Sequence, residues 1–305
     1  MMAAGFAAIY FVWGSTFLAI RIAVEEMPPF LMAGTRFVVA GGALFLWRLL
    51  LHGERPEPRH WAGAAAVGSL LFMGCNGAVV WSEQRVPSGL TALMLALIPL
   101  WMVLLDACMS DGAPLNARVI VGVLLGLAGL ALLLGPSRLL GARQVDPFGA
   151  CVLIAGSFCW ASGSIVSRRL PQPASAGLAA GMQMLLGGAV LMAAGLAAGE
   201  PSRVIAGAIT ARSILALAYL IVFGSIVGFT AYTWLLSATT PARVSTYAFV
   251  NPVVAVLLGW ALAGEPMSAR TLTASAVIVA AVAMIILSRG RPRVASVGEP
   301  DTGTP

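Results

Sequence analysis

Long apolar stretches alternate with short polar breaks along almost the whole chain. Each stretch is close to the roughly 20 residues that an α-helix needs to cross about 30 Å of hydrocarbon. The breaks are rich in proline, glycine and charge, and they leave no room for a water-soluble domain between helices. The pattern predicts an all-α integral membrane protein with ten transmembrane helices, at residues 3–23, 30–51, 61–82, 89–108, 117–135, 147–167, 174–197, 212–236, 243–263 and 271–288.

A short motif in the first of these stretches returns in the sixth. FVWGS at residues 11–15 is matched by FCWAS at residues 158–162, and similar offsets recur along the chain. We therefore predict two repeats of five helices, residues 1–140 and 141–290, followed by a disordered cytoplasmic tail at residues 291–305. Because five is odd, the second repeat enters the membrane upside down, and inverted repeats of this kind are a known route to alternating access.

The amino-acid composition excludes several classes of protein. Hydrophobic residues make up 59% of the chain and charged residues only 10%, against about 25% charged in soluble domains. The mean hydropathy is +0.93. Too little polar surface exists to cover a water-soluble globule, which excludes a soluble enzyme, a disordered protein and a nucleic-acid-binding domain. The net charge of +6 comes from arginines at the ends of apolar runs, which suits anchoring at a membrane face.

The arginines also indicate how the chain is oriented. An even number of spans places both termini on one side, and ten arginines lie near that side against seven near the other. Positive charge favours the cytoplasmic side, so we expect both termini in the cytoplasm and a multi-pass protein of the plasma (inner) membrane. No basic segment precedes the first apolar run, which we expect to be a retained helix and not a cleaved signal peptide.

Several motifs resemble one known family of transporters. WGSTF at residues 13–17, PPF at 28–30 and AGTRF at 33–37 are similar to the first two helices of EamA-type members of the drug/metabolite transporter superfamily. The run from PAR at 241–243 through YAFVNPVVAVLLG at 247–259 is a longer and more specific match, and the resemblance covers residues 3 to 288. It implies a ten-helix exporter of amino acids, drugs or other metabolites.

Arg36 is a charged residue well inside a predicted span. A charge near the centre of a bilayer costs at least about 2.5–3.5 kcal/mol, so it needs a partner, a cavity or a route to the interface. Glu26, Glu83 and Glu265 are candidate partners on the same face. Arg36 and Glu83 are therefore predicted to have a gating or structural role. Two interpretations of Arg36 stay open, a snorkelling arginine that ties helix ends and a residue that binds a substrate carboxylate.

Aromatic residues within the spans are candidates for the wall of a binding cavity. Trp13 and Trp160 are the pair related by the repeat, and Trp101 and Tyr247 also lie inside predicted helices. Rings on facing helices of two inverted repeats can stack on an apolar or aromatic solute. Ordinary core packing is the alternative interpretation of the same four residues.

Neutral polar residues at membrane depth form the second half of the predicted binding site. Each must find a hydrogen-bond partner where water is absent, and bonds between helices would meet that need for most of them. The predicted substrate-binding residues of this kind are Ser15, Thr16, Asn76, Ser162 and Asn251. Pro99 and Pro252 free backbone carbonyls in the fourth and ninth helices, and broken helices at corresponding points of two halves are typical of transporter sites.

These features together predict a secondary transporter. We expect export of small metabolites, first of all amino acids with apolar or aromatic side chains, with a broad drug or toxic-metabolite efflux carrier as the alternative. A channel or a membrane-embedded enzyme is disfavoured, because no polar filter and no nucleophile–base or metal motif occurs. We expect no cofactor, no metal and no nucleic acid, the lipid bilayer and a small-molecule substrate as partners, and a monomer or weak homodimer. The G-x-x-x-G at residues 122–126 is interpreted as a point where helices approach closely, with a dimer face as the alternative.

Overall fold

The structure is a computed structural model that describes residues 1–82, 91, 94–109, 115–135, 147–204, 209–263 and 268–288. These residues form helices and connecting turns without any β-strand, which confirms the predicted all-α class. Glu83, Glu265 and the tail at residues 291–305 lie outside the described residues. Six helical stretches are long and apolar enough to cross a membrane, namely Pro29–Leu51, Pro58–Ser82, Pro147–Ser167, Ala176–Ala197, Ala211–Ala238 and Ala269–Leu287.

Shorter apolar helices complete the bundle, and every described helix except the short η3 falls in or beside one of the ten predicted ranges. The count of ten spans stays a prediction. In chain order the elements are α1 (Met2–Ala7), η1 (Ala8–Val12), α2 (Trp13–Val24), α3 (Pro29–Leu51), α4 (Pro58–Gly68), η2 (Ser69–Gly77), α5 (Ala78–Ser82), α7 (Ile98–Ala107), α8 (Ala117–Leu134), α10 (Pro147–Ser167), α11 (Ala176–Ala197), η3 (Glu200–Arg203), α12 (Ala211–Tyr219), η5 (Leu220–Val227), α13 (Gly228–Ala238), α14 (Pro241–Val244), α15 (Tyr247–Ala263) and α16 (Ala269–Leu287).

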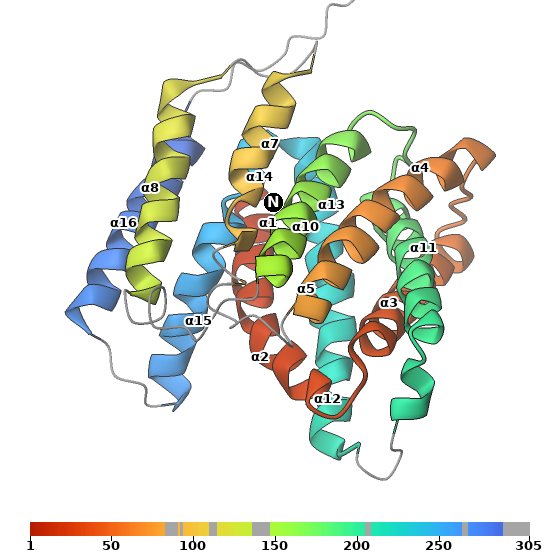
Figure 1. Cartoon of the computed structure of the whole chain (residues 1–305). Helices are drawn as coiled ribbons and strands as arrows, with labels where there is room; N and C mark the ends of the chain where they lie inside the picture. Colours follow the sequence, from red (N-terminus) through yellow and green to blue (C-terminus); the bar gives the residue numbers. More distant parts are fainter. Residues whose placement is uncertain are drawn as a thin grey trace, which may run out of the picture.

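Two close helix pairs form opposite edges of the bundle (Figure 1). At one edge α3 packs along α11, and at the other α8 packs along α16. Glycines allow the close approach at both edges, since a Cβ on Gly41 would lie 2.4 Å from the Leu185 backbone nitrogen, and one on Gly122 would lie 2.7 Å from Ile285. The glycines of the 122–126 motif therefore face this chain's own α15 and α16 and allow these helices to approach closely, while the oligomeric state stays a prediction.

Three of the helical stretches contain π-helical turns. These are η1 in the first stretch, η2 in the third and η5 in the eighth. A π-turn accommodates extra residues and rotates the following side chains relative to a regular α-helix, and such turns are frequent at functional sites. The three π-helical elements therefore influence which way the side chains that follow them point.

The fourth and ninth predicted helices are both interrupted. Residues 96–97 form a turn just before α7, which carries Pro99 in its first turn. Residues 245–246 form a turn between α14 and α15, and Pro252 lies inside α15. A proline in the first turn of a helix removes no intrahelical hydrogen bond, and Pro252 lies within α15 without a break in the helix at that point. Both turns therefore lie near the two prolines in the chain, and a link between these prolines and a binding site stays a prediction.

Carboxylates from distant segments cap two helix ends at one end of the bundle. Glu200 is 2% exposed and accepts hydrogen bonds from the backbone N–H groups of Phe30 and Leu31 at the start of α3, at 3.2 and 2.8 Å. Glu26 accepts one from the backbone N–H of Thr210, which precedes α12, at 2.8 Å. A negative charge is favourable at a helix N-terminus, so these contacts fasten the ends of α3 and α12.

Candidate functional site

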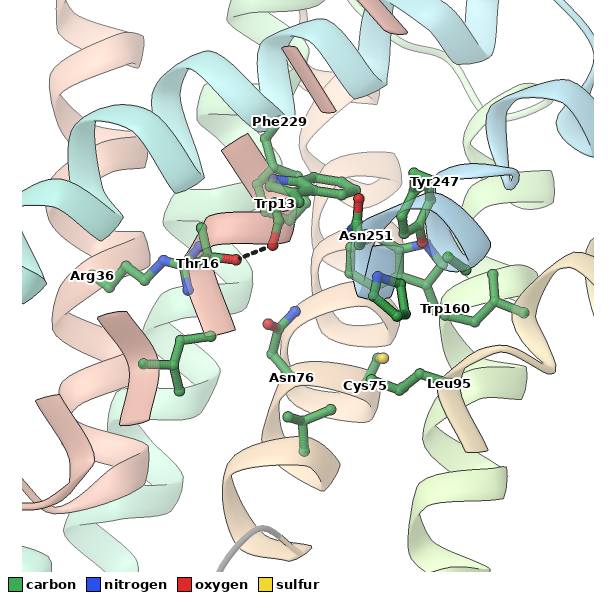
Figure 2. A pocket seen from close by; sticks show the side chains of 15 residues that line it. Trp13, Thr16, Arg36, Cys75, Asn76, Leu95, Trp160, Phe229, Tyr247 and Asn251 are labelled. Carbon is green, nitrogen blue, oxygen red and sulfur yellow. Dashed lines mark hydrogen bonds between the residues drawn. The ribbon is translucent and has the colours of Figure 1, made fainter. Parts of the chain in front are cut away.

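A cavity of about 110 Å³ lies in the middle of the bundle. Figure 2 shows its wall, to which seven of the ten predicted helices contribute. The lining residues are Trp13, Thr16, Ile20, Arg36, Cys75, Asn76, Val79, Leu95, Ile98, Trp160, Phe229, Tyr247, Ala248, Asn251 and Pro252.

Aromatic rings form one side of the cavity. Trp13 is the centre of this arrangement, with ring centroids 4.9 Å from Tyr247, 5.2 Å from Phe229 and from Tyr232, and 5.8 Å from Trp160. Several of the pairs are edge-to-face, an arrangement that the ring quadrupole favours. These five rings are called the aromatic cluster below, and all of them except Tyr232 line the cavity.

Hydrogen bonds fix the two tryptophans of this cluster. The indole nitrogen of Trp13 donates to the backbone carbonyl of Gly224 at 3.0 Å, and that of Trp160 donates to the Tyr232 hydroxyl at 2.9 Å. The Tyr232 hydroxyl also lies 2.6 Å from the hydroxyl of Ser164. Trp13 and Trp160 are only 7% and 6% exposed. The rings are therefore held rigidly, and they form part of the core as well as of the cavity wall.

Two glycines of the eighth stretch make room for this packing. A Cβ on Gly228 would lie 2.3 Å from the indole nitrogen of Trp13, and one on Gly224 would lie 2.9 Å from a guanidinium nitrogen of Arg36. These glycines are spaced four apart across η5 and the start of α13, and that G-x-x-x-G spacing was a signal in the sequence that we did not use. Phe229, which follows the second glycine, is a further lining residue that the sequence reading missed.

Arg36 lies in the cavity wall opposite most of the aromatic cluster (Figure 2). It is seven residues from Pro29 and thus about 10 Å along α3, and it is only 5% exposed. Its Nε donates to the hydroxyl of Ser225 in η5 at 2.8 Å, and its guanidinium carbon lies 4.7 Å from the centre of the Phe37 ring. Among the described residues no carboxylate lies within ion-pair distance of Arg36. The described Glu26 caps Thr210 instead, and the other two expected partners lie outside the described residues.

The neutral polar residues of the wall differ in how far their hydrogen bonds are satisfied. The Thr16 hydroxyl donates to the Trp13 carbonyl at 2.8 Å, and the Asn76 amide donates to the Leu71 carbonyl at 3.0 Å. With its amide nitrogen turned towards them, Asn251 donates to the backbone carbonyls of Tyr10 and Tyr247 at 3.1 Å each. Both amide side chains belong to residues of the cavity wall.

The hydroxyl of Tyr247 has no hydrogen-bond partner among the described residues, although it is buried. A buried hydroxyl without a partner costs free energy of the order of 1–3 kcal/mol. Tyr247 also lines the cavity, so this unsatisfied hydroxyl belongs to a residue of the cavity wall.

Three predicted binding residues lie elsewhere. The Ser15 hydroxyl is 2.5 Å from the Tyr219 hydroxyl, and the Trp101 indole donates to Ser157 at 3.1 Å between α7 and α10. Ser162 is half-buried and is not part of the lining. These residues were chosen because they lie at membrane depth, but depth does not say which face of a helix turns to the cavity. Trp13, Thr16, Arg36, Asn76, Trp160, Tyr247, Asn251 and Pro252 do share one cavity wall.

The lining of this cavity offers ring faces, hydrogen-bonding groups and the charge of Arg36. In the described part of the chain, no group of three or more histidine, cysteine or acidic side chains is placed to hold a metal ion. The lining supplies one guanidinium, two amides and two hydroxyls among mainly apolar and aromatic surface. A small organic molecule with an apolar body and few polar groups fits this chemistry.

Comparison with known proteins gives a consistent result over nearly the whole chain. The model of the EamA-like transporter family matches twice, at residues 1–135 and 147–287. The chain is 40% identical to the "Uncharacterized inner membrane transporter YedA" of Escherichia coli (strain K12), over 92% of this chain and 89% of that protein. It is 26% identical to the "Probable amino-acid metabolite efflux pump" of Salmonella typhimurium, over 88% of this chain and 89% of that protein.

Other similarities agree with these. The chain is 25% identical to "Protein PecM" of Dickeya dadantii, over 90% of this chain and 88% of that protein. A solved crystal structure has the same fold, with a TM-score of 0.75 over 93% of this chain and 95% of the other, at 23% sequence identity. The helix arrangement described above therefore also occurs in a solved structure.

Proposed function

This chain belongs to the EamA-like transporter family, and from that premise we propose that it exports small metabolites across the plasma (inner) membrane. Amino acids with apolar or aromatic side chains are the first expected substrates. The central cavity is the observation that carries this proposal, because it combines an aromatic wall with a few polar groups and a guanidinium. A relative of similar length is named as an amino-acid metabolite efflux pump, which supports the same substrate class.

Alternating access by two inverted five-helix units, residues 1–140 and 141–290, is the mechanism that we infer. The double match of the family model supports two units. So does the packing, because the helix that opens each unit contacts the third and fourth stretches of the other. Thus α2 contacts α12 and α15, while α10 contacts η2 and α7. Rocking of one unit against the other would then expose the cavity between them first to one side and then to the other.

A broad efflux carrier for drugs or toxic metabolites is the second candidate. The mainly apolar lining favours it, since apolar walls bind many solutes of similar size without demanding particular polar groups. Export assays separate the two candidates. An amino-acid exporter transports a solute with a carboxylate faster than a solute of equal size without one. A broad carrier transports solutes at rates that follow their apolar surface.

Export by a carrier can be tested with purified protein in liposomes. Vesicles loaded with phenylalanine and diluted into buffer with labelled phenylalanine should take up label by counterflow, and the initial rate should saturate with concentration. Vesicles with the Trp160→Ala variant serve as the comparison. A rate that rises linearly without counterflow would identify a channel, and no flux for any amino acid alongside flux of apolar cations would favour the broad carrier.

A further inference from the structure

We propose that Arg36 binds the carboxylate of the transported solute, and that an ammonium group on the solute is dispensable. This proposal rests on the proposed function, because it specifies which part of a metabolite the central cavity recognises. The solute would place its carboxylate at Arg36 and its apolar or aromatic body against the rings of Trp13, Trp160 and Tyr247. The required chemical class is thus a small organic acid with an apolar body, of which free amino acids are one kind.

The guanidinium of Arg36 is only partly satisfied by the protein. Its Nε donates to Ser225 at 2.8 Å, but its two terminal nitrogens have no hydrogen-bond acceptor among the described residues. The side chain is 95% buried, being only 5% exposed, and it lines the cavity. A guanidinium presents paired N–H groups that match the two oxygens of a carboxylate. The terminal donors of Arg36, which no described residue accepts, therefore point to an anionic ligand with two acceptor oxygens.

The charge balance of the wall is one-sided. Its described lining residues include Arg36 as the cation and contain no aspartate, glutamate, lysine or histidine. In a site with little water, electrostatic interactions are much stronger than in solution. A ligand with net negative charge is thus favoured over a neutral one, and a cation is disfavoured. An ammonium group meets neutral oxygen acceptors and ring faces here but no carboxylate among the described lining residues, so it is accepted without being required.

The opposite part of the wall provides the site for the apolar body. Figure 2 shows Arg36 at one side of the cavity and Tyr247, Asn251 and Trp160 at the other. The rings of Tyr247 and Trp160 line this part of the cavity and offer faces and edges against which an apolar or aromatic body can stack. A ligand that spans the cavity would then place its carboxylate at Arg36 and its body against these rings.

A purely structural role for Arg36 makes different predictions. In that case the guanidinium ties α3 to η5 through Ser225 and the Phe37 ring, and its loss lowers stability without altering which ligands bind. The two roles can be separated by the ratio of the affinities of two ligands for the same variant. A lower yield of folded protein affects both measurements equally and therefore leaves this ratio unchanged. The test is therefore a matched pair of ligands measured on each variant.

Calorimetric titration of the purified protein in detergent provides this test without any need for transport. The matched probes are N-acetylphenylalanine and N-acetylphenylalaninamide, which differ only in the carboxylate, with phenylalanine and phenethylamine as the zwitterion and the cation. We expect the acid to bind at least about tenfold more tightly than its amide, which corresponds to about 1.4 kcal/mol. Phenylalanine should bind within a few-fold of the acid, and phenethylamine more weakly than both.

Variants assign the preference to Arg36. In Arg36→Gln the acid-to-amide ratio should fall close to one. In Arg36→Lys it should fall severalfold, because an ammonium keeps the charge but not the paired donors. Arg243→Gln is the control, since it removes the same charge from a residue outside the lining that donates to the Ser288 carbonyl. It should keep the wild-type ratio.

The outcomes that overturn the proposal are equally definite. Equal binding of acid and amide by the wild-type protein would overturn it, as would an unchanged ratio in either folded variant of Arg36. If Arg36→Gln yields no folded protein, the Arg36→Lys ratio decides. A normal acid preference in a protein that shows no flux in liposomes would contradict the proposed function and still support this assignment.

Discussion

Trp13 shows how one side chain can serve both the core and the cavity. It contacts four other rings, donates a hydrogen bond to Gly224 and remains only 7% exposed. Because the same indole packs against four rings and lines the cavity, a substitution there changes both the packing of the core and the shape of the cavity. Substitutions at Trp13 therefore report on stability and on ligand binding at the same time, and they need a conservative variant for comparison.

We predict that Trp13→Ala lowers the free energy of unfolding by about 3–5 kcal/mol, as expected for a buried aromatic side chain that leaves a void. Trp13→Phe should cost less, because a ring still fills most of the space and about 1 kcal/mol is lost with the hydrogen bond to Gly224. Thermal unfolding in detergent measures both. A melting temperature of Trp13→Ala equal to that of the wild type would contradict the packing described here.

At the scale of elements, the π-helical stretch η5 and the glycines on and after it hold the site together. Ser225 in η5 receives the hydrogen bond of Arg36, the Gly224 carbonyl receives that of Trp13, and Gly228 leaves space for the indole. One helix segment thus positions both the cation and the central ring. A small change in its backbone should disturb the two together.

We predict that Gly228→Ala destabilises the protein and weakens ligand binding. A Cβ there would lie 2.3 Å from the Trp13 indole nitrogen, and the surrounding rings prevent the indole from moving away. Gly42→Ala is the matched control, because its Cβ would meet only Leu185 at 3.9 Å and alanine is the better helix former by about 1 kcal/mol. The control should melt at or above the wild-type temperature. Equal melting temperatures and equal ligand affinities of the two variants would refute the role assigned to Gly228.

The Glu26 cap on α12 should make stability depend on pH in the acidic range. Hydrogen bonds from the Ser213 hydroxyl and from the Thr210 backbone hold the pKa of Glu26 below its ordinary value of 4.5. A carboxylate with a lowered folded-state pKa contributes stability that is complete above the unfolded value and is lost as the pH falls through the folded value. We therefore expect the contribution to disappear below pH 4.5.

Melting temperatures measured over a pH series for the wild type and for Glu26→Gln test this prediction. Above pH 4.5 the wild type should melt at a higher temperature than Glu26→Gln. This difference should disappear as the pH falls below 4.5, because protonation removes the charge that the variant lacks at every pH. An advantage that persists unchanged into strong acid would mean that the carboxylate charge does not stabilise this helix end.

At the scale of the whole molecule, packing between the two matched segments dominates the architecture. The most extensive helix pairs, α3 with α11 and α8 with α16, each join one segment to the other. The cavity wall also takes residues from both, with Arg36 and Trp13 from the first and Trp160 and Tyr247 from the second. Neither segment could therefore enclose this cavity without the other.

Orientation in the membrane is the prediction at this scale. Ten arginines near the terminal side against seven near the other favour cytoplasmic termini. A reporter that is active only in the cytoplasm, fused to the C-terminus, should therefore be active. The same reporter placed in the turn at residues 25–28 should be silent. The reverse pattern from well-expressed fusions would overturn the orientation.

The sequence by itself determined the class of protein and the positions of its helices. Apolar runs of membrane-spanning length can only be helical, because backbone groups in hydrocarbon must bond within their own segment. The repeated motif around Trp13 and Trp160 also marks two residues of the cavity wall. Arg36 stood out because a charge at that depth needs a specific reason.

Tertiary structure decided which polar and aromatic residues share the cavity. Ser15, Trp101 and Ser162 lie at the expected depth, yet the first two bond to neighbouring helices and the third lies outside the wall. Phe229 lines the cavity, although its own position in the sequence does not distinguish it from the other apolar residues of its helix. Depth follows from counting residues along a helix, whereas the direction of a side chain follows from helix rotation, and the π-turns and the packing of glycines against distant residues set that rotation.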